Sequence, residues 1–111
     1  LNIKGADEAG HDGLAVEKKN FIEKLDCALE PLVNLPECLI VVCADHSTPC
    51  CIRDHSADPV PLVIMGEGVR TDAVTRFDEI ACAQGGLNRI SGSALMPIIG
   101  DLINRAKKYG A

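Results

Sequence analysis

The segment LIVVCADHSTPC, residues 39–50, decides the expected fold. It opens with an unbroken apolar run over 39–44, and this length and pattern are typical of a strand that is buried on both faces of a parallel sheet. Asp45 and His46 follow directly, just past the end of the expected strand. Open α/β sheets bind their ligands outside the carboxyl ends of the strands. The segment therefore predicts a buried strand and a site at its end.

Helix-like and strand-like patterns flank this segment on both sides. A glycine-rich acidic loop is expected over 5–13, and Pro31 and Pro36 bracket the end of the first helix. The expected elements are a strand tail at 1–4, a helix at 14–33, strands at 39–44 and 62–65, and helices at 78–84 and 93–108. This alternation predicts an α/β fold with a mainly parallel sheet flanked by helices.

Composition excludes several classes of function. The chain has 111 residues, which favours one domain, and a net charge of −5 without a basic run. Nucleic acid and anionic membrane surfaces are therefore not expected partners. The longest apolar stretch is much shorter than a membrane span, and no signal peptide is recognisable. A cytoplasmic protein is the expectation.

Six cysteines raise the alternative of a disulfide framework or a zinc ribbon. They are Cys27, Cys38, Cys43, Cys50, Cys51 and Cys82. None of them forms a C-x-x-C pair, and two are adjacent. Without a secretory signal, reduced thiols are the favoured interpretation.

All three histidines of the chain lie beside acidic residues in expected loops. Asp7 and His11 are four residues apart, Asp45 and His46 are adjacent, and His55 follows another aspartate. Carboxylates and imidazoles together are typical ligands of manganese or zinc. The spacing alone leaves open that each histidine is an ordinary hydrogen-bonding loop residue.

Four segments resemble a known family when they are taken in order. They are KGADEAGHDG (4–13), ADHSTPC (44–50), DHSADPVP (54–61) and CAQGGLNRISGSALMPIIGDLINRAKKYGA (82–111). They are similar to the C-terminal part of the archaeal-type cofactor-independent phosphoglycerate mutases, which belong to the alkaline phosphatase-like metalloenzymes. The resemblance implies that residues 1–111 are the C-terminal portion of the metal-binding domain, within a three-layer sandwich. Because the chain opens at Leu1 in what reads as mid-strand, we expect a fragment of a longer polypeptide.

The resemblance also implies a pair of divalent ions and an activity. Asp7, His11 and His55 would bind one ion, and Asp45 and His46 the other. Manganese is the favoured metal, with zinc, magnesium and cobalt as alternatives. The implied reaction interconverts 2-phosphoglycerate and 3-phosphoglycerate in glycolysis and gluconeogenesis through a phosphoserine. The nucleophilic serine of the family lies upstream, so no catalytic nucleophile is expected in this chain.

Two other functions stay open. One is another metal-dependent phosphohydrolase or phosphomutase of the same superfamily, with the same ligands. The other is a metal-binding fragment without catalysis. In either case we expect the isolated chain to be inactive, and to associate with itself or with the missing N-terminal part because a sheet edge is left exposed.

Several polar neighbours of the candidate ligands have simpler expected roles. Turn hydrogen bonding is favoured over nucleophilic catalysis for Ser47, Thr48 and Ser56, and a turn role for Asp58. Asp12 and Asp54 are the residues that could orient the adjacent imidazoles of His11 and His55.

Overall fold

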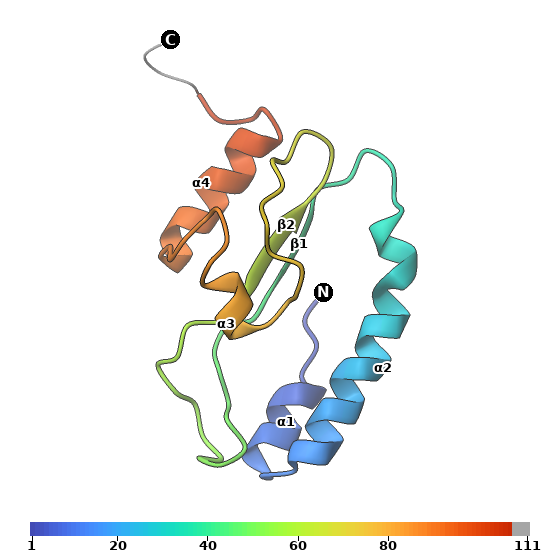
Figure 1. The fold of residues 1–111 in the computed structure, drawn as a ribbon, viewed down its shortest axis with the longest axis vertical. Coiled ribbons are helices and arrows are strands. Elements are labelled where there is room, and N and C mark those ends of the chain that lie inside the picture. The colour runs from blue at the N-terminus through green and yellow to red at the C-terminus, as the bar shows by residue number, and fades with distance from the viewer. Residues whose placement is uncertain (108–111) are drawn as a thin grey trace. The chain divides into compact units, whose positions relative to one another are not determined.

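Figure 1 shows the computed structural model of the chain, which describes residues 1–107. Contacts divide the chain into two compact units. The first comprises residues 1–36 and 44–60, and the second comprises 37–43 and the residues from 61 onwards. All the predicted metal ligands belong to the first unit.

Two helices form the frame of the first unit. They are α1, Gly5–His11, and α2, Ala15–Val33, and they pack against each other. Gly13 makes the turn between them with φ of 74°, a left-handed conformation that glycine adopts without steric cost. Gly5 lies against the ring of Phe21, where a Cβ atom would overlap the aromatic carbons. The close approach of the helices therefore depends on glycine in α1.

The prediction of an irregular loop over 5–13 was wrong, because most of it is α1. Glycine disfavours helices by up to about 1 kcal/mol per residue, so its density was taken as a loop signal. Asp7 and Glu8 in the first turn oppose that effect by stabilising the positive end of the helix dipole. Packing against α2 stabilises α1 further.

The helix predicted over 14–33 is confirmed as α2. Its half-buried side chains recur at helical spacing: Lys18, Phe21, Leu25 and Leu29. Pro31 lies within its last turn and the helix ends two residues later, at Val33.

The remainder of the first unit is the segment 44–60, which has no helix or strand. A single antiparallel bridge joins Ser47 to Ser56, with the Ser56 amide donating to the Ser47 carbonyl at 2.9 Å. Between them, the amides of Ile52 and Arg53 both donate to the Pro49 carbonyl, which closes a turn. The bridge brings the residues just before each serine, His46 and His55, close together.

The second unit contains two short strands, and their direction corrects a prediction. The strands β1, Ile40–Cys43, and β2, Leu62–Met65, pair antiparallel, with Ile40 opposite Met65 and Cys43 opposite Leu62. We predicted a mainly parallel sheet from the two apolar runs. Such runs report burial on both faces and not direction, and the connection over 44–61 contains no crossover helix, which a parallel pair would require. The residues at 1–4, predicted as a strand tail, are not in a strand.

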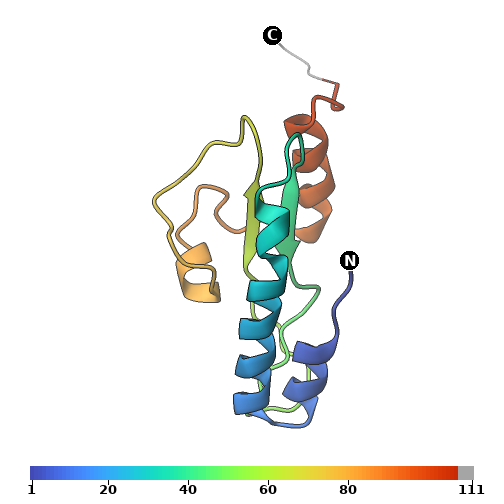
Figure 2. The ribbon, with the colours of Figure 1, turned by 90° about the vertical axis from the view of Figure 1, so that its right-hand side faces the viewer.

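Two helices complete the second unit. The short helix predicted at 78–84 is present as α3, Glu79–Cys82, and the Asp78 side chain caps it by accepting from the Ala81 amide at 2.8 Å. The last helix, α4, Gly92–Leu102, lies beside the strand pair in both Figure 1 and Figure 2. The structure is thus a mixed α/β chain.

The end of α4 comes earlier than the predicted residue 108, which itself lies outside the described residues. Asn104 adopts φ of 56°, and the Arg105 and Ala106 amides donate to the Gly100 carbonyl. This is the left-handed closing turn that commonly ends helices. Asparagine tolerates that conformation better than most residues, so the signal was present in the sequence.

Burial in residues 1–107 is slight. Gly10 and Thr48 are the buried residues in this range, and no hydrophobic side chain there is buried. Large apolar side chains such as Val16, Ile80 and Met96 are more than half exposed. None of the helices in this range combines the length and apolarity needed to cross a bilayer.

Asp72 joins two stretches of backbone in the second unit through its carboxylate. Its carboxylate accepts from the Gly86 amide at 2.7 Å and the Val74 amide at 2.9 Å. These two backbone hydrogen bonds hold the pKa of Asp72 below its ordinary value of 3.8.

A carboxyl whose pKa is lower in the folded state stabilises the protein above its unfolded pKa, and this contribution is lost as the pH falls through the folded value. We therefore expect wild type to lose stability on acidification below about pH 4 more steeply than Asp72→Asn. Thermal unfolding between pH 2.5 and 7 checks this. Parallel pH profiles for the two proteins would contradict it.

Candidate metal centre

Three side chains of the first unit converge on one point. Nε2 of His11 lies 3.2 Å from Nε2 of His55 and 3.5 Å from Oδ1 of Asp7, and Nε2 of His55 lies 3.8 Å from the same oxygen. Asp7 is about one-third exposed and both histidines are more exposed. The three atoms form a nearly regular triangle that is open to solvent on one side.

This triangle has the dimensions of a divalent metal site. Imidazole nitrogens and carboxylate oxygens bind such ions at about 2.0–2.2 Å, so tetrahedral ligands lie roughly 3.4 Å from one another. The three observed separations, 3.2, 3.5 and 3.8 Å, are close to that value. An ion could bind here with the existing rotamers and keep a position open on the solvent side.

Local structure explains why these residues meet. Asp7 and His11 are four residues apart on α1, which places their side chains on the same face of the helix. His55 is carried by the segment 44–60, at the end of the turn that follows Pro49. Gly10, the buried residue of α1, lets this segment approach, because a Cβ there would lie 2.5 Å from the Thr48 carbonyl oxygen.

The ring of His11 is oriented by the backbone. Its Nδ1 lies 3.1 Å from the Arg53 carbonyl oxygen, which can only accept, so Nδ1 carries the hydrogen. Nε2 of the neutral ring then presents a lone pair to the triangle. This is the arrangement that outer hydrogen bonds impose on metal-binding histidines.

The prediction that Asp12 orients His11 was wrong, because the Arg53 carbonyl takes that role. Arg53 holds φ of 58°, a left-handed conformation that costs a non-glycine residue on the order of 1–3 kcal/mol. Its side chain lies against Gly13. Asp54 also acts differently from the prediction: its carboxylate accepts from the backbone amide of His55 at 2.8 Å.

The second predicted pair, Asp45 and His46, lies beside the triangle. Nε2 of His46 is 3.6 Å from Oδ1 of Asp45, and the His46 ring stacks on the His55 ring with centroids 3.6 Å apart. Nδ1 of His46 is 4.0 Å from Oδ1 of Asp7. The structure therefore brings all five predicted ligands into one cluster, with Asp45 the most exposed at 83%.

Thr48 joins the two groups and was missed as a site residue. Its hydroxyl donates to Oδ1 of Asp7 at 2.6 Å and lies 3.1 Å from Nδ1 of His46. Its carbonyl oxygen accepts from Nζ of Lys18 at 2.7 Å, and its side chain is 4% exposed. The sequence placed Thr48 next to the A-D-H segment but gave no sign of its partner on α1, 41 residues away.

The hydrogen bond from Thr48 is the main reason that the pKa of Asp7 lies below its ordinary value of 3.8. The charges of His11, His46 and His55 act in the same direction, while desolvation opposes them. The carboxylate therefore stays ionised at neutral pH, as a metal ligand must be.

The serine hydroxyls of this segment turn away from the cluster. Ser47 donates to the Asp58 carbonyl at 3.4 Å, and Ser56 donates to the Asp58 carboxylate at 2.6 Å. Ser56 thus bonds locally, to a residue two positions on, as the turn role predicted for it implies, whereas the Ser47 hydroxyl bonds across 11 residues and not within a turn. All six cysteines are free thiols. Sγ of Cys50 lies 3.9 Å from the carbonyl oxygen of Ala9 in α1.

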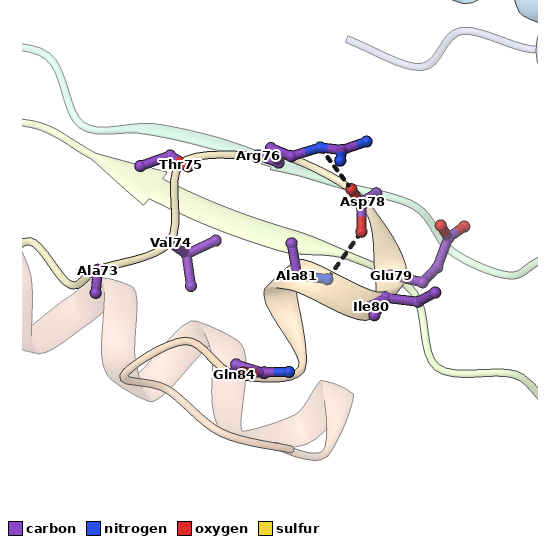
Figure 3. A pocket seen from close by; sticks show the side chains of 9 residues that line it. All are labelled: Ala73, Val74, Thr75, Arg76, Asp78, Glu79, Ile80, Ala81 and Gln84. Atoms are coloured by element: carbon purple, nitrogen blue, oxygen red, sulfur yellow. Dashed lines mark hydrogen bonds and ion pairs between the residues drawn. The ribbon is translucent and has the colours of Figure 1, made fainter.

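A pocket in the second unit is separate from these residues. Figure 3 shows its lining, which comes from the segment before α3, from α3 itself and from Gln84 just after α3. Arg76 and Asp78 form an ion pair there at 3.4 Å, and Asp78 also caps α3. The lining residues are Ala73, Val74, Thr75, Arg76, Asp78, Glu79, Ile80, Ala81 and Gln84. Histidine and cysteine are absent from this lining, and the group found within residues 1–107 that could hold a metal ion is Asp7, His11 and His55.

Comparison with known proteins decides the family. The model of the metalloenzyme superfamily matches residues 1–101. The chain belongs to the metalloenzyme superfamily. Membership agrees with the Asp7, His11 and His55 triangle, whose ligand atoms all lie within 4.8 Å of one another. It implies a divalent metal for this centre.

Relatives within the metalloenzyme superfamily carry a consistent name. A 2,3-bisphosphoglycerate-independent phosphoglycerate mutase from Methanoculleus marisnigri is 66% identical over 111 residues, which cover all of this chain and 27% of that protein. The protein of the same name from Methanobrevibacter smithii is 53% identical over 112 residues, again covering 27% of its length. The chain thus spans about a quarter of the length of the curated relatives it matches.

The fold is also found among solved structures. The PH0037 protein from Pyrococcus horikoshii superposes with a TM-score of 0.89 and 46% sequence identity. The match covers 96% of this chain and 33% of that protein. The fold of this member of the metalloenzyme superfamily is therefore one that a solved protein also contains, again as a part of a larger chain.

Proposed function

We propose that this chain is the C-terminal, metal-binding portion of a cofactor-independent phosphoglycerate mutase that interconverts 2-phosphoglycerate and 3-phosphoglycerate. The observation that carries the proposal is the triangle of Asp7, His11 and His55, with Asp45 and His46 beside it, in a chain whose relatives bear that name. The remainder of the polypeptide would complete a three-layer sandwich with a mainly parallel sheet. The absence of any buried hydrophobic side chain within residues 1–107 supports such a covering part, because a folded domain normally encloses an apolar core.

In this proposal the five side chains divide between two ions. Asp7, His11 and His55 supply three ligands to one ion, and Asp45 and His46 supply two ligands to the other. A pair of divalent ions, with manganese favoured, would lower the pKa of a serine hydroxyl and neutralise charge on the transferring phosphoryl group. The exposed position of Asp45 supports a second site that other residues complete.

The nucleophilic serine would come from the rest of the polypeptide. Ser47 and Ser56 support this indirectly, since both hydroxyls donate to Asp58 and not toward the ligand cluster. The chain's own residues would hold the ions and keep their lone pairs available. Orientation of His11 by the Arg53 carbonyl and ionisation of Asp7 serve that task.

The test uses the full-length protein with 3-phosphoglycerate and no added 2,3-bisphosphoglycerate. We expect formation of 2-phosphoglycerate that is lost after chelation with EDTA and restored by manganese, with a phosphoserine trapped at acid pH. His46→Ala is expected to lower the rate at least about 100-fold, since a lost ligand exceeds the 10–100-fold effect of an outer residue. Glu8→Ala, an exposed substitution on α1, is the matched control and is expected to keep the rate.

The other outcomes select the alternatives. Release of inorganic phosphate without 2-phosphoglycerate would indicate a metal-dependent phosphohydrolase of the same superfamily. Tight manganese binding without turnover of either phosphoglycerate would indicate a metal-binding protein without this activity. Activity that survives exhaustive chelation would contradict the proposal altogether.

A further inference from the structure

The hydroxyl of Thr48 lies between the two groups of candidate ligands. On one side it is 2.6 Å from Oδ1 of Asp7, and on the other it is 3.1 Å from Nδ1 of His46. A hydroxyl has one hydrogen to donate and two lone pairs with which to accept. An ionised carboxylate can only accept, so the hydrogen points to Asp7 and the lone pairs face His46.

This assignment fixes the tautomer of His46. Since the Thr48 oxygen accepts, Nδ1 of His46 must carry the hydrogen, and Nε2 is left with the lone pair. Nε2 is the atom that faces Asp45, at 3.6 Å. His11 is held in the same tautomer by the Arg53 carbonyl. Both rings therefore present Nε2 as the available ligand atom.

Thr48 is itself held rigidly. Its carbonyl oxygen accepts from Lys18, its methyl group lies where a side chain on Gly10 would be, and it is almost fully buried. A rigid hydroxyl costs little further ordering when it orients its partners.

We infer that Thr48 is a positioning residue whose single hydroxyl sets Asp7 for one ion site and His46 for the other. The inference rests on the proposed function for the identity of the ligands. It adds that the two sites share one support, so loss of the hydroxyl weakens both. The three groups are linked by two consecutive hydrogen bonds, since His46 donates to Thr48 and Thr48 donates to Asp7.

The test compares Thr48→Val with Thr48→Ser in the full-length protein. Valine keeps the shape and removes the hydroxyl, while serine keeps the hydroxyl and removes the methyl group. Titration with manganese alone is expected to show a 10–100-fold loss of affinity at both sites in Thr48→Val, the range found for outer partners of metal ligands. Thr48→Ser is expected to stay within about fivefold of wild type, below that 10–100-fold range. Ser47→Ala, one residue away and bonded to Asp58, is the control and is expected to bind as wild type does.

A second readout needs no metal and reports on His46 directly. With the histidines labelled with ¹⁵N and the protein free of metal at about pH 8, where imidazole is ordinarily neutral, the ring-nitrogen signals distinguish the tautomers. His46, assigned through His46→Ala, is expected to carry its hydrogen on Nδ1 in wild type and Thr48→Ser, and to lose that preference in Thr48→Val. Unfolding curves of the metal-free proteins identify a variant that fails to fold.

An unchanged His46 tautomer in a folded Thr48→Val protein would overturn the inference, whatever the manganese affinities are. So would a Thr48→Val protein that keeps both affinities, or loses only one of them. If wild type binds no manganese, the proposed function falls, and the ring-nitrogen signals alone then decide whether Thr48 orients His46.

Discussion

Replacing His11 with alanine is expected to abolish tight binding of one divalent ion and leave the other site measurable. His11 contributes the atom with the two shortest separations in the triangle, 3.2 Å to His55 and 3.5 Å to Asp7. Its loss leaves two ligands that were 3.8 Å apart and no backbone-fixed ring between them. We expect the affinity of that site to fall by more than about 100-fold, because loss of a ligand exceeds the effect of losing an outer partner.

Calorimetric titration of the full-length protein with manganese measures this effect, with metal content after dialysis as a second check. Asp12→Ala is the matched control: the residue is adjacent, exposed and acidic, and the Arg53 carbonyl, not Asp12, bonds the His11 ring. We expect that control to bind manganese as wild type does. A His11→Ala protein that retained both sites would remove His11 from the centre, and a weakened control would restore an orienting role to Asp12.

Replacing Gly10 with alanine is expected to damage both the fold of the first unit and the metal centre. The new Cβ would lie 2.5 Å from the Thr48 carbonyl oxygen and 2.9 Å from its methyl carbon, distances that real contacts do not sustain. Neither neighbour can rotate away, since one is backbone and Thr48 is buried between α1 and α2 residues. The segment 44–60 must shift, at a cost of about 1–3 kcal/mol for overpacking.

Gly100→Ala is the control, for which we expect an unchanged or increased stability. Gly100 lies inside α4, and apart from the backbone of α4 itself a Cβ there meets nothing within 4 Å among residues 1–107. Exchange of a helical glycine for alanine at such a position stabilises by about 0.5–1 kcal/mol. Thermal unfolding should therefore give a lower Tm for Gly10→Ala and an equal or higher Tm for Gly100→Ala.

The Gly10 substitution should also weaken metal binding, because displacement of Thr48 disturbs its hydrogen bonds to Asp7 and His46. We expect manganese affinity to fall by about tenfold or more, the lower end of the effect of outer partners. A Gly10→Ala protein with unchanged Tm and unchanged affinity would show that the segment moves freely, and would contradict the tight contact described above.

The residues that could be predicted from the sequence are those whose chemistry is local or carried by a recognisable segment. The helix α2 followed from its apolar spacing, and α3 lies within the short helix expected over 78–84. The five candidate ligands were found because carboxylate and imidazole stand together in segments that resemble a family. The structure brings all five into one cluster, and their role as ligands remains a prediction.

The residues that were missed act through backbone groups or over long sequence separations. The Arg53 carbonyl is present in every residue type, so no side-chain pattern marks it. Thr48 meets Asp7 across 41 residues, and that pairing exists because Gly10 lets α1 approach the segment 44–60. The glycines of α1 were read as loop residues, although in the structure they are the points of closest packing.

By itself, the sequence identified the candidate metal ligands, the positions of the long helix α2 and the two apolar strands, and the family that the chain resembles. Only the tertiary structure decided that α1 is a helix, that β1 and β2 pair antiparallel, and that Thr48 joins the two ligand groups. The physical reason is the range of the forces involved. Helical periodicity and ligand chemistry are properties of neighbouring residues, whereas strand direction, glycine contacts and shared hydrogen bonds are set by segments that meet after the chain has folded.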